Sequence, residues 1–235
     1  MDKEKLRVVS FNMFYALGKK RLTRTVFETF AELNPDVICL QEVLIGKKHN
    51  FARDLADHLG YHLSFSLRAT LANRHMGMAI LTREPPEETS SIVLPRSSSR
   101  RPRVLQIVTF QKDSIRWNIA NTHLAVGSLS SRARREQITA VITMLNRTQD
   151  AIPTILAGDF NTKTKKEVLD FNTILESVGF QTQTAEPYSW KMLGVKRKLD
   201  WIAARNCTIQ DAGVLQEVKG SDHKPIWADI ATRAK

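Results

Sequence analysis

The strongest constraint on the fold of this chain is the short apolar run around Ile155 and Leu156, which stops at Gly158. Such a run is typical of a buried strand, and we expect Gly158 to let the backbone turn sharply. Asp159 and Asn161 follow, and side chains two residues apart can point to the same side of an extended segment. The pair suits the binding of a water molecule and a phosphoryl oxygen. Taken alone, these residues are better explained by an Asx turn that caps the strand.

Short apolar runs of this kind alternate with amphipathic segments along the chain. Strands are predicted at 6–11, 36–40 (ending in Gln41-Glu42), 61–66, 78–81, 104–110, 115–122, 199–203 and 226–230. Helices are predicted at 21–33, 50–59, 131–147 and 165–178, whereas residues 84–91 form a polar stretch without a predicted element. No linker, low-complexity tract or internal repeat interrupts this order, so residues 1–235 are predicted to form a single α/β domain.

The charge of the chain suggests a polyanionic partner. Lys and Arg total 35 against 24 Asp and Glu, which gives a net charge of +11. Nucleic acid is the first candidate for such a partner and an anionic membrane surface the second. An uneven surface charge on an ordinary protein is the simpler alternative. Hydrophobic residues make up 42% of the chain, which favours a globular fold over disorder.

The cysteines and the N-terminal residues predict a cytoplasmic protein. Cys39 lies in an apolar run and is expected to be a buried thiol, and with Cys207 it gives neither a disulfide framework nor a zinc spacing. Residues 1–5 carry charge without an apolar segment, and no run reaches the length of a membrane span. We therefore expect no signal peptide and no stable membrane insertion, and nothing indicates an obligate protein partner.

Polar residues stand where several of the predicted strands begin or end. These residues are Asn12, Glu42, His123, Asp159, Asn161, Asp200, Asp222 and His223. In α/β sheets, functional groups gather where strands meet loops at one edge. Glu42 is the most informative, because a carboxylate that ends so apolar a strand is unfavourable unless it is paired or bound to a cation. Taken alone, a simple surface charge explains Glu42 equally well.

Together these residue types predict a site for one hard divalent cation, Mg²⁺ with Mn²⁺ as a substitute. Magnesium typically takes one or two carboxylates and completes its octahedron with water and substrate phosphate. Asp222 adds a carboxylate beside the imidazole of His223, which Asp200 can orient and polarise. The 6 histidines come without a cysteine cluster or an HExxH motif, which argues against zinc.

The order of these motifs resembles that of the endonuclease/exonuclease/phosphatase superfamily, which includes DNase I. The resemblance rests on Phe11-Asn12, Gln41-Glu42, Thr122-His123, Gly158-Asp159-Phe160-Asn161, Leu199-Asp200 and Ser221-Asp222-His223. It spans nearly the whole chain, and so many blocks in the correct order are hard to reach by chance. It implies a DNase I-like four-layer α/β sandwich: two mixed sheets face to face, helices outside and the active site at one edge. Glu42 would bind the metal, with Asn12 and Asp222 close by.

The resemblance also implies catalytic roles for the other motif residues. Asp159 would orient or deprotonate the attacking water. Asn161 and His123 would hold the phosphoryl oxygens. His223, supported by Asp200, would stabilise the pentacovalent transition state, whose added negative charge the metal also offsets.

The sequence departs from individual branches of the superfamily. AP endonucleases of the exonuclease III type carry an aspartate where Phe14 stands and typically a tyrosine where His123 stands, so the chain is placed outside that branch. DNase I pairs its equivalent of His123 with a glutamate, and residues 74–78 hold no clear counterpart. Many bacterial members have an asparagine where Met78 stands. The group that protonates the leaving group is therefore left unassigned.

Lysine and arginine cluster in the loops beside these motifs. They are Lys19, Lys20, Arg21, Arg24, Lys47, Lys48, Lys163, Lys165, Lys166, Lys196, Arg197, Lys198, Lys219 and Lys224, and Arg100, Arg101 and Arg103 extend the set. A groove of this sign tracks a phosphate backbone without sequence preference, although charge runs are also common in solvated loops. Tyr188 and Trp190 lie nearby and can stack on a base, whereas the other tryptophans are predicted to lie in the core.

Three functions are compatible with these features. We expect a metal-dependent nuclease, most simply a DNA endonuclease with little sequence preference that uses in-line attack of water on phosphorus. The alternative is a phosphodiesterase or phosphatase of lipid head groups, inositol phosphates or nucleotides, although no long apolar insertion for membrane docking is present. The third is a non-catalytic nucleic-acid-binding module. It does not explain carboxylates such as Glu42 and Asp159, which would repel a phosphate without a metal.

Overall fold

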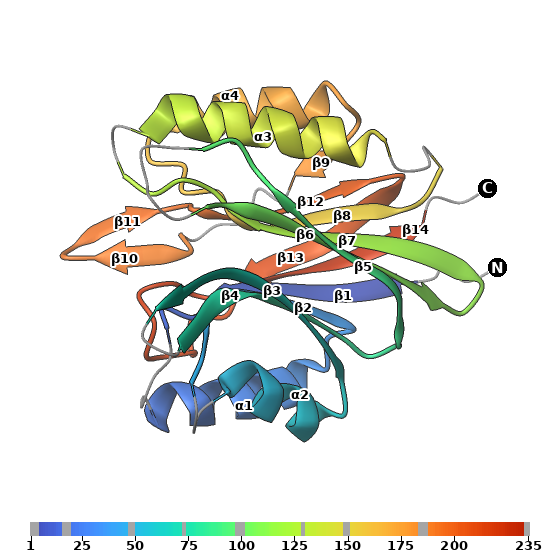
Figure 1. The fold of residues 1–235 in the computed structure, drawn as a ribbon, viewed down its shortest axis with the longest axis vertical. Coiled ribbons are helices and arrows are strands. Elements are labelled where there is room, and N and C mark those ends of the chain that lie inside the picture. The colour runs from blue at the N-terminus through green and yellow to red at the C-terminus, as the bar shows by residue number, and fades with distance from the viewer. Residues whose placement is uncertain are drawn as a thin grey trace.

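The computed structural model describes residues 5–15, 20–46, 50–71, 74–96, 102–127, 130–147, 151–182 and 188–232. Within these ranges, two six-stranded mixed sheets face each other, and two helices cover the outer face of each sheet (Figure 1). This arrangement confirms the predicted four-layer α/β sandwich. None of these helices is both long enough and apolar enough to cross a membrane.

The first sheet has the strand order β13-β14-β1-β2-β4-β3. Its strands are β1 (Lys5–Asn12), β2 (Val37–Ile45), β3 (His62–Leu71), β4 (Arg74–Thr82), β13 (Cys207–Val214) and β14 (Ile226–Thr232). β1 and β2 are parallel, and the other neighbours are antiparallel. Helices α1 (Lys20–Leu33) and α2 (Phe51–Leu59) cover its outer face, at the bottom of Figure 1.

The second sheet has the strand order β5-β6-β7-β8-β12-β9. Its strands are β5 (Pro86–Val93), β6 (Val104–Lys112), β7 (Ile115–His123), β8 (Thr154–Asp159), β9 (Gln181–Thr182) and β12 (Asp200–Arg205). β7 and β8 are parallel, and helices α3 (Ser131–Leu145) and α4 (Lys165–Glu176) cover the outer face. A separate hairpin of β10 (Trp190–Met192) and β11 (Val195–Arg197) projects at the left of Figure 1.

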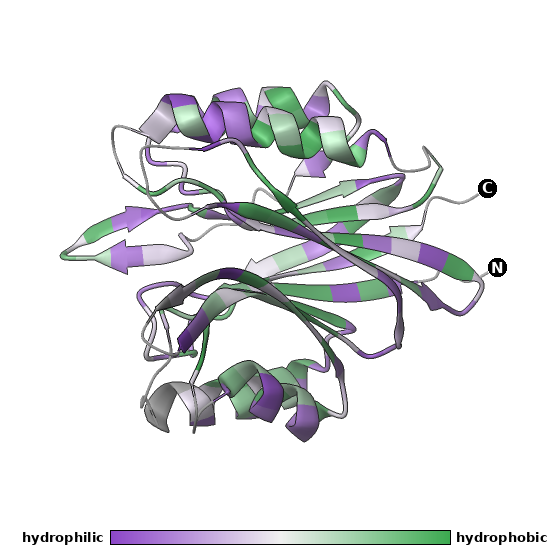
Figure 2. Cartoon of the chain, viewed as in Figure 1, coloured by the Kyte–Doolittle hydropathy of each residue, from purple (hydrophilic) through white to green (hydrophobic). Residues whose placement is uncertain are grey.

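Three apolar clusters lie between the four layers. The central cluster joins the two sheets, with Cys39 from the first and Trp117 and Ile155 from the second. The other two lie between each sheet and its helices, and Trp201 belongs to the cluster beneath α3 and α4. Figure 2 shows the hydrophobic residues along the central strands. Trp117 and Trp201 are fully buried, as predicted, whereas Trp227 is only partly buried.

The strands β5, β9 and β13 and the β10–β11 hairpin were not predicted from the sequence. β5 begins in the polar stretch 84–91 and continues to Val93, and most of its side chains are exposed because it is an edge strand of the second sheet. β13 is an edge strand of the first sheet, and a bulge interrupts its pairing between Ile209 and Asp211. Edge strands bury few side chains, so the alternation of apolar and polar residues that marks a strand is weak in them.

The topology brings polar residues from several strands to one edge of the sandwich. β1, β7 and β8 end there in Asn12, His123 and Asp159. β12 is antiparallel to β8 and begins at the same edge, so that Asp200 pairs with Asp159. β14 is antiparallel to β1 and begins shortly after His223. We call the edge that these residues define the polar edge.

Candidate active site

Glu42 lies inside β2 and not at its end. The strand continues to Ile45, which corrects the prediction that it ends in Gln41-Glu42. Its pairing with β4 shifts register between Leu40 and Val43, and Glu42 adopts a left-handed φ of 53° in this bulge. Such a backbone is unfavourable for a residue with a side chain, and bulges of this kind often direct a side chain into a functional site.

A buried amide network supports this bulge. Gln41 Nε2 donates a hydrogen bond to Asn121 Oδ1 at 2.8 Å. Asn121 Nδ2 in turn donates to the carbonyl oxygens of Leu40 and Ala79, both at 3.1 Å. Because Asn121 belongs to β7, the network fastens the second sheet to the first beside Glu42. Neither amide was assigned a role from the sequence, although Gln41 belongs to one motif block and Asn121 directly precedes another.

The Glu42 carboxylate lacks a donor for one of its oxygens. The side chain is only 12% exposed, and no described residue donates a hydrogen bond to its buried Oε2. Burial raises the pKa of Glu42, while His223 and Asn12 act in the opposite direction. A buried carboxylate oxygen without a partner is costly, and a divalent cation with oxygen ligands would satisfy it.

Asp159 is buried and accepts two hydrogen bonds. Asn12 Nδ2 donates to its Oδ2, and the backbone N–H of Asn161 donates to its Oδ1, both at 2.9 Å. The second bond closes an Asx turn, so the structural interpretation of this stretch is correct and is compatible with a functional one. Burial raises the pKa of Asp159 to about 7, against the opposing charge of His223. Its carboxyl group can therefore accept and release a proton near neutral pH.

Gly158 has a different role from the predicted one. It lies within β8, opposite Thr122 of β7, and the strand ends one residue later. Its φ is 146°, and a Cβ at this position would lie 1.9 Å from the carbonyl oxygen of Thr122. The glycine therefore permits the close approach of the two strands that places Asp159 beside His123.

His223 is held as a cation facing Asp159. Its Nδ1 is bonded to Asp200 Oδ2 at 2.8 Å, and its Nε2 lies 3.8 Å from Asp159 Oδ2. Burial lowers the pKa of His223, but Asp200 and Asp159 outweigh burial and raise it to about 10. Ser221 Oγ accepts the backbone N–H of His223 at 3.1 Å and donates to the carbonyl oxygen of Asn12 at 2.9 Å. These bonds fasten the loop before β14 to the end of β1.

His123 is buried in its neutral form. Its Nε2 lies 3.5 Å from Asp159 Oδ2 and 4.0 Å from Glu42 Oε1. Burial, together with the charges of Arg103 and Arg68, holds the pKa of His123 well below its usual value, so these contacts are not ion pairs at neutral pH. Within the described ranges neither ring nitrogen has a hydrogen-bond partner. This agrees with the missing glutamate noted in the sequence.

The side chains at the polar edge fit a divalent cation. Asp159, Asp200 and His223 each offer a ligand atom within 4.8 Å of the others. In that group, Nδ1 of His223 is already bonded to Asp200, which favours a positioned imidazole over a metal ligand. Glu42 adds a carboxylate oxygen with no partner among the described residues. A set dominated by carboxylate oxygens is the kind that Mg²⁺ and Mn²⁺ prefer.

The aromatic residues predicted to bind substrate lie at the base of the projecting hairpin. Trp190 begins β10, and its Nε1 donates to Asp222 Oδ2 at 2.9 Å, while Arg197 lies 5.6 Å from its ring centre. Nζ of Lys196 lies over the ring of Tyr188, 4.6 Å from the ring centre. Trp190 therefore links the hairpin to Asp222, the carboxylate predicted to lie near the metal.

A basic groove runs beside α4 and the hairpin. Two adjoining cavities of about 500 and 490 Å³ share Lys163, Thr164 and Arg197. The remaining basic residues of their lining are Lys165, Lys166, Lys196, Lys198 and Arg135. The structure thus brings together two lysine-rich segments that lie apart in the sequence. The first begins at Lys163, two residues after Asn161, and the second begins at Lys196. Arg100 and Arg101 lie outside the described residues.

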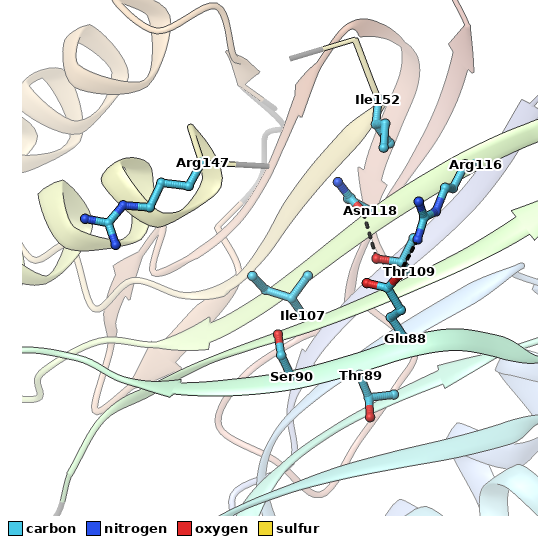
Figure 3. Close-up of a pocket in the computed structure, with 9 residues that line it drawn as sticks. All are labelled: Glu88, Thr89, Ser90, Ile107, Thr109, Arg116, Asn118, Arg147 and Ile152. Carbon is cyan, nitrogen blue, oxygen red and sulfur yellow. Dashed lines mark hydrogen bonds and ion pairs between the residues drawn. The ribbon is translucent and has the colours of Figure 1, made fainter. Parts of the chain in front are cut away.

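A further cavity of about 360 Å³ lies on the second sheet, away from the polar edge (Figure 3). Its lining contains none of the predicted site residues. Arg116 in this cavity is paired with Glu88 at 2.6 Å, and Thr109 Oγ1 donates to Asn118 Oδ1 at 2.8 Å. Arg116 and Asn118 lie near the start of β7, whereas His123 lies at its end.

Comparisons with known proteins agree with this architecture. A sequence model described as the Endonuclease/Exonuclease/phosphatase family matches residues 9–223, whereas a search of curated proteins finds no match. An endonuclease/exonuclease/phosphatase from Beutenbergia cavernae has a TM-score of 0.81 at 21% identity, over 97% of this chain and 72% of that one. D. rerio TDP2 complexed with single-strand DNA product has a TM-score of 0.80 at 19% identity, over 97% of this chain and 100% of that one. The human Nocturnin catalytic domain with bound sulfate anion has a TM-score of 0.79 at 22% identity, over 98% of this chain and 97% of that one. At these identities, the likeness concerns the fold alone.

Proposed function

Since the chain belongs to the endonuclease/exonuclease/phosphatase family, we propose that it hydrolyses phosphodiester bonds of nucleic acid, with DNA favoured and with little sequence preference. Family membership and the buried cluster of Asp159, Asp200 and His223 make it a metal-dependent phosphoesterase. The observation that carries the finer proposal is the basic groove, whose lining residues Thr162 and Lys198 lie three and two residues from Asp159 and Asp200 in the chain and are joined by a hydrogen bond. We also propose that residues 1–235 form one catalytic domain.

The metal would be Mg²⁺, with Mn²⁺ as a substitute. Glu42 would hold it through the carboxylate oxygen that has no partner among the described residues, with Asn12 and Asp222 nearby. When bound, the ion polarises a phosphoryl oxygen and offsets the negative charge that develops on it.

The protein side chains supply the proton transfer and the orientation of the phosphoryl group. Asp159, held by Asn12 and by the backbone of Asn161, takes the proton of the attacking water. His223, kept protonated by Asp200, faces the charge that builds up on phosphorus. Asn161 Nδ2 donates one hydrogen to the carbonyl oxygen of Leu124 at 3.3 Å, and an amide nitrogen has a second hydrogen for a phosphoryl oxygen.

The basic groove favours a substrate with several phosphates. Its cationic side chains lie along α4 and the hairpin, so that they can follow a phosphate backbone beyond the reacting group. Phosphate contacts of this kind position a nucleic acid without reading its bases. D. rerio TDP2, of the same fold, was solved with a single-strand DNA product, which supports nucleic acid as the substrate class.

Incubation with supercoiled plasmid and Mg²⁺ tests the proposal. We expect nicking that EDTA abolishes and that added Mg²⁺ or Mn²⁺ restores. Asp159→Ala is expected to abolish nicking without loss of the fold, measured by circular dichroism, while Asp54→Ala on α2 serves as the matched control. Nicking that survives EDTA would refute the metal requirement, and full activity of Asp159→Ala would refute its assigned role.

The alternative is a phosphodiesterase or phosphatase of lipid head groups, inositol phosphates or nucleotides. The size of the two cavities favours it, because pockets of a few hundred cubic ångströms are typical of small-molecule sites. The same incubation with nucleotides and inositol phosphates decides between the two. Release of phosphate from these compounds, with plasmid and RNA left intact, would replace the nuclease proposal.

A further inference from the structure

Arg103 lies at the polar edge and has no assigned role. It directly precedes β6, in which Leu105 pairs with Thr122 of β7. This register places Arg103 beside the end of β7 that carries His123. Sequence reasoning counted Arg103 with a basic surface loop, whereas the structure buries it, with 5% exposure.

Arg68 reaches the same region from the first sheet. It is the extra residue of a bulge in β3, where that strand passes Gly77 of β4. On the other side of β4, Gly77 pairs with Val43, the residue after Glu42. A Cβ at Gly77 would lie 2.1 Å from the carbonyl oxygen of Ser66, so only glycine permits this packing. The bulges that carry Glu42 and Arg68 therefore flank one point of β4.

Both guanidinium groups keep donors without an acceptor. Among the described residues, none accepts a hydrogen bond from Nε or Nη1 of Arg103, or from Nε of Arg68. Burial and the charge of Arg68 lower the pKa of Arg103 to about 10, which still leaves it charged at neutral pH. Buried charges are normally paired, so the buried Arg103 and the half-buried Arg68, each with a buried donor atom that has no acceptor among the described residues, indicate a missing anion.

The carboxylates at the polar edge compensate these charges only in part. The charges of Asp159 and Glu42 raise the pKa of Arg103, whereas the charges of Arg103 and Arg68 lower the pKa of His123. A divalent cation held by Glu42 would neutralise that carboxylate and leave the arginines in excess. The non-bridging oxygens of a phosphoryl group offer the paired acceptors that guanidinium groups bind best.

We propose that Arg68 and Arg103, one from each sheet, clamp the non-bridging oxygens of the phosphoryl group under attack. The clamp rests on the proposed phosphodiesterase function and adds two substrate-contacting residues on the His123 side of the site. It recognises phosphate alone, and it therefore accords with cleavage that ignores base identity.

Calorimetric titration with inorganic phosphate in the presence of Mg²⁺ measures the clamp without turnover. Arg103→Met and Arg68→Met are each expected to raise the Kd for phosphate about 10- to 100-fold. Arg103→Lys should recover part of the affinity, because lysine keeps the charge but not the two-pronged geometry. Arg53→Met, on the distant helix α2, is the matched control. Unchanged affinity in both methionine variants would overturn the clamp.

Thermal unfolding separates a binding role from a structural one. Without phosphate, Arg103→Met should raise the melting temperature, because it replaces an unpaired buried charge with an apolar side chain. A lowered melting temperature with unchanged phosphate affinity would make Arg103 structural and refute the proposal. Arg68 is only half-buried, so Arg68→Met allows the same binding test if Arg103→Met does not fold.

Kinetics with bis(p-nitrophenyl) phosphate, a diester with one phosphate, locate the clamp. We expect Arg103→Met to lose kcat/KM on this compound and on DNA alike. A loss confined to DNA would place the arginines at a neighbouring phosphate and overturn the assignment. If the wild-type protein hydrolyses neither substrate but binds phosphate through Arg103, the proposed function fails, and the catalytic role of the clamp fails with it, while the two arginines remain a phosphate-binding pair. Hydrolysis that both methionine variants retain in full refutes the clamp alone.

Discussion

Replacement of Asn121 by alanine should weaken both the fold and the metal site. The side chain is fully buried and takes part in three hydrogen bonds: one from Gln41 Nε2 and two to the carbonyl oxygens of Leu40 and Ala79. At about 1–1.5 kcal/mol for each bond, the free energy of unfolding should fall by about 3–5 kcal/mol. For a protein of this size, the melting temperature should fall by about 6–20 °C.

Loss of the three hydrogen bonds should also displace Glu42, because the network holds the bulge in which Glu42 lies. We expect Asn121→Ala to require a higher Mg²⁺ concentration for half-maximal hydrolysis. Urea unfolding followed by circular dichroism measures the first effect, and a Mg²⁺ titration of activity measures the second.

Asn118→Ala is the matched control, since Asn118 is a buried asparagine of the same strand that accepts a hydrogen bond from Thr109 and lies far from Glu42. Asn118→Ala should cost about 1 kcal/mol and leave the Mg²⁺ requirement unchanged. The reasoning is refuted if Asn121→Ala costs less than about 1 kcal/mol or if both variants shift the Mg²⁺ requirement equally.

The ionisable groups and the basic groove give three further expectations. At saturating Mg²⁺, kcat/KM should rise with pH and level off at or below about 7, because Asp159 must be ionised to accept a proton and a cation nearby favours its carboxylate. An acidic limb that persists above pH 8 would contradict this role. The rate should fall as pH passes about 10, where His223 loses its proton; Asp200→Asn should move this alkaline limb to lower pH, because the Asp200 charge raises the pKa of His223. An alkaline limb that stays in place would show that Asp200 does not control the protonation of His223. Charge reversal at Lys163 and Lys166 should weaken DNA binding and make the plot of log K against log salt shallower by about 2. An unchanged slope, measured by fluorescence anisotropy, would place the DNA path elsewhere.

The sequence was most informative about strand ends. Asn12, His123 and Asp159 each follow a segment that is predicted to be a strand, and the structure ends a strand at each of them. Their meeting at one edge follows from parallel and antiparallel pairing, which apolar runs do not specify. The edge strands β5 and β13 gave no signal, because a strand with one paired side and few buried side chains needs little apolar sequence.

The sequence by itself determined the α/β class and the polar residues available at the polar edge, and it placed Asn12, His123 and Asp159, although not Glu42, correctly at strand ends. Local propensity and the order of the motifs suffice for this, because both are properties of the chain. Only the tertiary structure decided how those residues act. The bulge at Glu42 depends on pairing with β4, the pKa of Asp159 depends on burial and on His223, and the burial of Arg103 depends on packing between the two sheets. Register, burial and the charges of distant neighbours arise from contacts between segments far apart in the chain, and no local pattern encodes them.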